Sequence, residues 1–203
     1  MGITTRDLRV IRLLEKRFIA NAEILSRLIF WSGNEKSSLS VTQRRLKELH
    51  NLKQLKRVRQ YIGQSYVYYL GKAPNKIEHR LAMSDFLSQM NVHGFEVILE
   101  ETEVEFKELE ELFGIRPDML VTFKHGDKTF QALVEIDLTK QFTHVNEYNR
   151  FLKARRNGET NLLTEYPLAL VSVCDKKPKG INCVWIKPDW SNFSNFTYSF
   201  VKK

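Results

Sequence analysis

The sequence of 203 residues contains few cysteines and no long apolar run. Cys174 and Cys183 are too few for a disulfide framework, and they give no basis for a zinc site of four Cys or His ligands. The longest apolar stretches, such as residues 168–173, span only a few residues, whereas a membrane-spanning helix needs about 20. The first residues also lack the apolar core of a signal peptide. These absences predict a cytoplasmic protein without a membrane partner.

Several short motifs of known chemistry are missing as well. The sequence has no GxxxxGK[ST] phosphate loop and no GxSxG nucleophile elbow, which argues against ATP-driven function and against a serine hydrolase of that type. A relaxase of the histidine-pair type needs two histidines one residue apart near a tyrosine. The five histidines do not provide such a pair; they are His50, His79, His93, His125 and His144. Tyr148 is therefore expected to be a structural aromatic residue rather than a covalent nucleophile.

Positive charge is concentrated in the first third of the chain. Residues 1–75 carry 15 Lys and Arg against 5 Asp and Glu, a net charge of +10, whereas residues 76–203 carry 17 against 19, a net charge of −2. A positive field confined to one segment indicates a polyanionic partner, although a merely solvated basic surface is the alternative.

The same segment has the pattern of three short helices followed by a β-hairpin. Apolar residues at helical spacing predict helices over residues 5–17 and 21–30, and a third helix that opens at Ser38 or Ser40. β-branched and aromatic residues on either side of Gly63 predict a hairpin over residues 55–70. The third helix buries one face, which leaves polar side chains opposite it. The predicted DNA-contacting side chains of this helix and of the first hairpin strand are Ser40, Gln43, Arg44, Lys47, Lys56, Arg57 and Arg59.

The order of these elements resembles the winged-helix family. The segment SVTQRRLKEL at residues 40–49, followed by LKRV at 55–58, is similar to a recognition helix and a wing. A helix fits the major groove of double-stranded DNA, where its solvent face reaches base edges, and a basic wing contacts phosphates. A winged helix used for protein contact is the alternative.

A second domain of mixed α/β type is predicted after residue 74. Gly71, Pro74 and their neighbours break the pattern, so we expect a winged-helix domain over residues 1–74 and a second domain over 75–203. The second domain is predicted to run helix, strand, hairpin, helix, strand. The overall prediction is an α+β protein.

Three acidic residues stand at the ends of the predicted hairpin strands. Asp118 begins the first strand, and Glu135 and Asp137 are two apart on the second, so both project from the same face. Because buried carboxylates are costly unless they are paired or bound to a cation, and because Mg²⁺ and Mn²⁺ prefer oxygen ligands, these three are candidate metal ligands. A structural polar cluster is the alternative.

The order of elements and the acid spacing resemble the PD-(D/E)xK nuclease superfamily over roughly residues 76–188. The matching residues are Pro117-Asp118 and Glu135-Ile136-Asp137. The resemblance implies a nuclease-like domain that cleaves DNA with Mg²⁺ or Mn²⁺, with no cofactor if it is inactive. The superfamily places a lysine where this chain has Asp137, and Lys140 or Lys153 could substitute for it.

The whole chain resembles the replication-relaxation family of bacterial plasmids and other mobile elements. His79-Arg80-Leu81 and Arg116-Pro117-Asp118 add to the features above. The resemblance implies a role in replication, DNA transfer or its control. The alternative is a non-catalytic transcriptional regulator whose second domain forms a homodimer or binds a partner.

Overall fold

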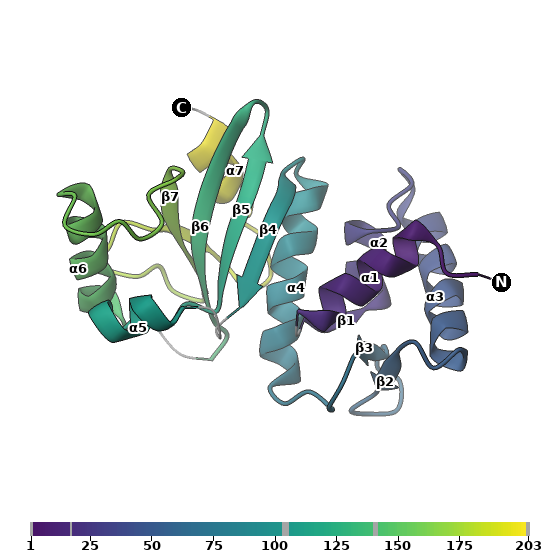
Figure 1. The fold of residues 1–203 in the computed structure, drawn as a ribbon. Helices are drawn as coiled ribbons and strands as arrows, with labels where there is room; N and C mark the ends of the chain where they lie inside the picture. The colour runs from purple at the N-terminus through teal and green to yellow at the C-terminus, as the bar shows by residue number, and fades with distance from the viewer. Residues whose placement is uncertain (1, 17, 103–105, 140–141, 202–203) are drawn as a thin grey trace. The chain divides into compact units, whose positions relative to one another are not determined.

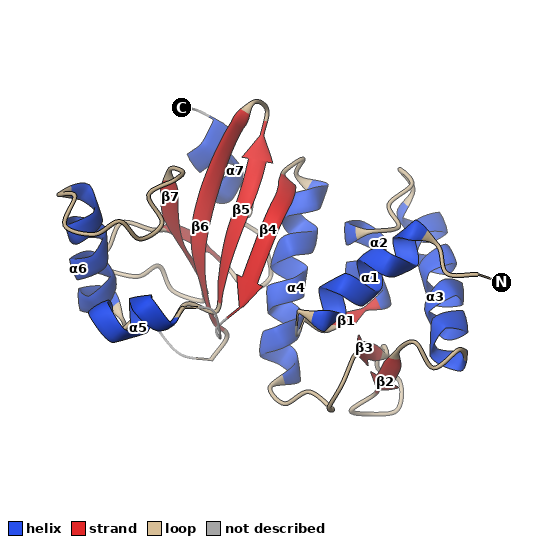
Figure 2. Ribbon diagram, in the orientation of Figure 1, coloured by secondary structure: helices blue, strands red, loops and turns tan. Residues whose placement is uncertain are grey.

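The computed structural model describes residues 2–16, 18–102, 106–139 and 142–201, which contain seven helices and two sheets (Figures 1 and 2). The predicted α+β class is therefore confirmed. Within these ranges, no helix is long and apolar enough to cross a membrane. The chain divides into two compact units, Met1–Val92 and His93–Lys203, each described here by itself.

The first unit opens with three helices whose N-termini are capped by side chains. Helix α1 (Thr5–Glu15) begins at a reciprocal capping box between Thr4 and Asp7, α2 (Ala22–Leu28) follows Asn21, and α3 (Glu35–Asn51) follows Asn34.

The predicted start of the third helix at Ser38 or Ser40 is wrong. Asn34 accepts a hydrogen bond from the Ser37 N–H at 3.0 Å and begins the helix earlier. Ser38 lies inside the first turn, and its hydroxyl donates to the Asn34 carbonyl at 2.7 Å. The first turn of α3 is polar and has no apolar residue at helical spacing, so the sequence pattern did not indicate that the helix begins there.

The predicted hairpin is confirmed, with shorter strands. Strands β2 (Lys56–Val58) and β3 (Val67–Tyr69) pair antiparallel. The short strand β1 (Ala20–Asn21) pairs with the other edge of β3, which gives a sheet of order β1-β3-β2.

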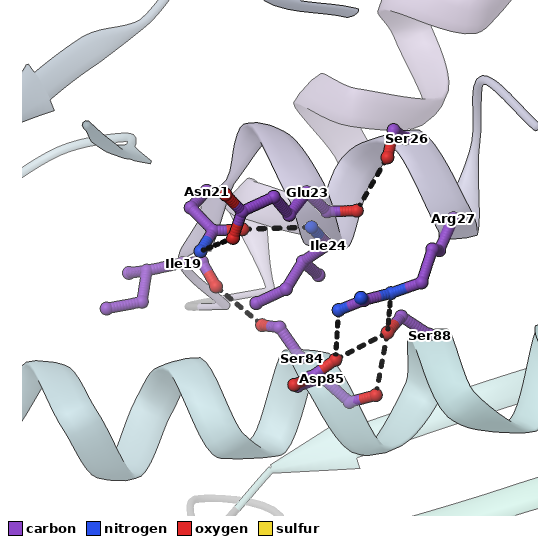
Figure 3. Close-up of polar contacts among 9 residues, drawn as sticks. All are labelled: Ile19, Asn21, Glu23, Ile24, Ser26, Arg27, Ser84, Asp85 and Ser88. Carbon is purple, nitrogen blue, oxygen red and sulfur yellow. Dashed lines mark hydrogen bonds and ion pairs between the residues drawn. The ribbon is translucent and has the colours of Figure 1, made fainter. Parts of the chain in front are cut away.

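Helix α4 (Ile77–Val92) is joined to α2 by polar contacts that Figure 3 draws. Arg27 on α2 donates to Asp85 at 2.7 Å and to Ser88 at 3.2 Å. The Ser84 hydroxyl donates to the Ile19 carbonyl at 2.6 Å. These bonds explain why α4 belongs to the first compact unit, whereas the sequence assigned residues 75–92 to the second domain.

The second unit contains a five-stranded mixed sheet of order β4-β5-β6-β7-β8, and Figure 2 labels the strands β4 to β7. The strands are β4 (Glu96–Thr102), β5 (Met119–His125), β6 (Lys128–Asp137), β7 (Leu168–Cys174) and β8 (Val184–Ile186). The first three pair antiparallel, and β6, β7 and β8 pair parallel. Helix α6 (Val145–Arg156) connects β6 to β7, as a parallel pair requires a long crossover.

Helices cover both faces of this sheet. Helices α5 (Lys107–Phe113) and α6 share a buried cluster with Leu120 and Leu133. Helix α7 (Ser194–Val201) packs aromatic rings against Phe95 and Phe123 on the other face. The unit is thus built in three layers. Because alternate residues of a strand face opposite sides, Glu135 shares the α5–α6 face with Leu133.

Candidate functional site

Helix α3 separates a buried face from an exposed polar face. Thr42, Leu46 and Leu49 are fully buried. The predicted contact residues Ser40, Gln43, Arg44 and Lys47 are all exposed. These four residues present two cations and two neutral hydrogen-bonding side chains to the solvent.

A buried ion pair fixes α3 against α1. The Arg45 guanidinium donates to both carboxylate oxygens of Asp7, at 2.8 Å and 2.6 Å, and to Glu48 at 2.6 Å. Asp7 is fully buried, and it also accepts hydrogen bonds from the backbone N–H and the hydroxyl of Thr4. Burial raises the pKa of Asp7, but the hydrogen bonds and charge of Arg45, with the bonds from Thr4, outweigh it and lower the pKa of Asp7 to about 2.

The sequence pattern did not identify this pair, because Asp7 and Arg45 lie far apart in the chain. The pair positions the helix that carries Arg44 and Lys47, since Arg45 lies between them in sequence and is turned toward α1. Arg45 thus contributes through the orientation of α3 and is a positioning residue.

Two of the three predicted hairpin cations share one aromatic ring. The guanidinium carbons of Arg57 and Arg59 lie 4.1 Å and 4.8 Å from the ring centroid of Tyr66. Such cation–π contacts hold the two side chains together at the base of the β2–β3 loop. Lys56 is exposed, and its ammonium donates to the Gly71 carbonyl at 2.6 Å.

An open cleft of about 610 Å³ adjoins α3 and adds a cation that the sequence pattern did not identify. Arg6 from the first turn of α1 lines this cleft together with Val41 and Arg44 of α3. Arg6 therefore extends the positive surface of α3. An isolated arginine before the first apolar position of a helix carries no signal for this placement.

In the second unit, two of the three predicted acids accept hydrogen bonds, one of them from a buried hydroxyl. The Tyr148 hydroxyl on α6 donates to Glu135 Oε1 at 2.5 Å, and the Ile136 N–H donates to Asp118 Oδ2 at 2.7 Å. Burial, and then the charges of Glu135, Asp118 and Asp137, raise the pKa of Tyr148 far above its ordinary value. Tyr148 is fully buried, as expected of a structural aromatic residue, and it remains a neutral hydrogen-bond donor.

These carboxylates do not form a metal centre as they lie. Among residues 2–16, 18–102, 106–139 and 142–201, no three His, Cys, Asp or Glu side chains are arranged to hold a metal ion. One oxygen of Asp118 and one of Glu135 already accept hydrogen bonds from the protein. Metal binding by these side chains therefore stays a prediction.

Lys140 and Lys153 are the two lysines predicted to substitute for the motif lysine that Asp137 replaces. Lys153 is exposed on α6 and lines an open cleft beside Phe113 and Arg150. On the same helix, the Tyr148 hydroxyl donates to Glu135. Lys140 lies outside the described residues.

Comparison with known proteins adds no assignment: no protein-family model matches the chain, and no curated protein matches its sequence.

Proposed function

We propose that the chain is a DNA-binding protein whose first unit acts as a winged helix. The observation that carries the proposal is the exposed face of α3, with Arg44 and Lys47 opposite a fully buried face, in a segment whose net charge is +10. The antiparallel hairpin that follows α3 carries further cations, as a wing would.

Helix α3 and the β2–β3 hairpin would contact different parts of the DNA. An α-helix fits the major groove, so Gln43 and Arg44 would reach base edges from α3. The hairpin arginines, held on Tyr66, would contact phosphates. The Asp7–Arg45 pair would keep α3 at a fixed angle to the rest of the unit.

Substitution of Arg44 by alanine is expected to weaken binding to a DNA duplex by roughly 1–3 kcal/mol, because the side chain would contact a base. Fluorescence anisotropy of a labelled duplex at fixed salt measures the effect. Arg156→Ala is the matched control, since it removes the same charge from an exposed position on α6, to which we assign no DNA contact. Equal affinity of the Arg44 variant and wild type would reject the role of Arg44.

For the second unit we propose a nuclease-like fold. An antiparallel β4-β5-β6 meander, a helical crossover and a parallel β7 support this, with Asp118 preceding β5 and both Glu135 and Asp137 on β6. The function that this fold would serve is the replication, transfer or control of a plasmid or other mobile element. The alternative is a non-catalytic transcriptional regulator whose second domain forms a homodimer or binds a partner.

Relaxation of supercoiled plasmid in the presence of Mn²⁺ distinguishes a second unit that nicks DNA from a non-catalytic regulator. If the second unit nicks DNA, wild type relaxes the plasmid and Asp118→Asn does not, because the substitution removes a charged oxygen ligand. Glu147→Gln, which neutralises an acid in the first turn of α6, is the control and should relax the plasmid like wild type. Equal relaxation by wild type and Asp118→Asn would remove the metal-site assignment, and no relaxation by either would favour the regulator.

A further inference from the structure

The loop between β2 and β3 exposes two large apolar side chains at its tip. Ile62 is 97% exposed and Tyr61 is 70% exposed. Single exposed apolar residues are common on protein surfaces, so exposure alone carries no function. Here, however, the exposed pair follows Arg57 and Arg59 in the most basic segment of the chain.

The backbone holds Ile62 at the corner of a tight turn. The Gln64 N–H donates to the Tyr61 carbonyl at 3.3 Å, and Gly63 has a φ of +97°. A turn with a left-handed third residue requires glycine there, which leaves the second residue, Ile62, at the outer corner. The side chain is thus presented by a defined turn.

The base of the same loop is strongly positive. Arg57 and Arg59 both contact the Tyr66 ring, so their guanidinium groups are gathered near the loop that carries Ile62. Arg59 and Ile62 are three residues apart, a span of at most about 10 Å along an extended chain. An apolar tip with arginines at its base is the arrangement by which minor-groove proteins insert a wedge between base pairs while cations contact the backbone.

We infer that the β2–β3 loop enters the minor groove of double-stranded DNA and that Ile62 inserts between base pairs, which bends the duplex. This inference rests on the proposed DNA-binding function and extends it from binding to deformation. The minor groove is about 6 Å wide, so it admits a turn with one leading side chain but excludes a helix. Steps such as TA unstack most easily and are the expected points of insertion.

The test is a duplex with several TA steps, labelled at its ends for energy transfer and carrying 2-aminopurine at one TA step. Binding of the full chain is expected to raise both the energy transfer and the 2-aminopurine fluorescence, because the duplex bends and unstacks. Ile62→Ser is expected to lose both signals while it weakens affinity by no more than about tenfold, the effect of one apolar contact. Ile98→Ser, at an exposed isoleucine of β4, is the matched control and should behave like wild type.

The outcomes separate this inference from the proposed function. If wild type binds the duplex without bending it, the insertion of Ile62 is overturned and DNA binding stands. The same conclusion follows if the Ile62→Ser variant bends the duplex as wild type does. Absence of duplex binding by wild type overturns the proposed function and the wedge with it. Binding of wild type to anionic vesicles that depends on Ile62, with a straight duplex, assigns the tip to a membrane surface and also overturns the inference. Because the Ile62 side chain is almost fully exposed, the thermal unfolding of the Ile62→Ser variant should match that of wild type.

Discussion

Replacement of Asp7 by alanine is expected to destabilise the first unit by about 3 kcal/mol. The substitution leaves Arg45 in a site where its side chain is only 11% exposed, and loss of one partner from a buried ion pair costs about 3–5 kcal/mol. The lower end applies because Glu48 and the Gly2 carbonyl still accept hydrogen bonds from Arg45. Urea unfolding followed by hydrogen exchange in α1 and α3 peptides measures the change.

The matched control for this substitution is Glu15→Ala, which removes an exposed acid from the same helix and should change stability by less than about 0.5 kcal/mol. The double variant with Arg45→Ala should lose clearly less than the sum of the two single losses, because the two side chains interact directly. Unfolding of Asp7→Ala at the same urea concentration as Glu15→Ala would show that the pair does not hold α3.

The same pair makes stability depend on pH. The pKa of Asp7 is lowered from 3.8 to about 2 in the folded protein, so the folded state favours the ionised carboxylate. The stabilisation is therefore fully present above about pH 5 and is lost as the pH falls to about 2. The stability difference between wild type and Asp7→Ala should shrink by about 2 kcal/mol over this interval. A difference that stays constant would contradict the lowered pKa.

Replacement of Phe196 by alanine is expected to destabilise the second unit by about 3–5 kcal/mol, the cost of removing a buried aromatic side chain. Phe196 is fully buried, and its ring centroid lies 4.7–5.4 Å from those of Phe95, Phe123, Phe193 and Phe200. The substitution empties the centre of the layer between α7 and the sheet. Tryptophan fluorescence reports the unfolding, because Trp185 and Trp190 both lie in this unit.

Tyr198→Ala is the control for this layer, since it truncates a ring on the same helix that is 62% exposed. Its effect should stay within about 0.5 kcal/mol. If both variants unfold alike, helix α7 does not cover the sheet in the way described.

Helix α7 could not be predicted from the sequence pattern. Phe193, Phe196 and Phe200 follow helical spacing, but serines and asparagines between them resemble a loop, and no helix was predicted there. The helices α1 and α2 were predicted well, because apolar residues recur along them at regular helical spacing. Local signals thus located the elements where a clear periodic pattern was present.

At the candidate sites, contacts between residues far apart in the sequence could not be predicted. Helical periodicity correctly assigned Arg44 and Lys47 to the exposed face of α3. No local pattern could indicate that Tyr148 would donate a hydrogen bond to Glu135 or that Arg45 would turn toward Asp7. Such pairs arise from tertiary packing, and a single sequence carries no direct signal for them.

The duplex titration with wild type and Arg44→Ala, repeated over a series of salt concentrations, tests the central claim most directly. If the hairpin cations bind the DNA backbone, the logarithm of affinity falls linearly with the logarithm of salt concentration, by about 0.9 for each phosphate neutralised. Arg44→Ala should lie below wild type throughout the series, and Arg156→Ala should bind like wild type. A wild-type affinity that does not change with salt, or an Arg44→Ala variant that binds as wild type does, would contradict the account.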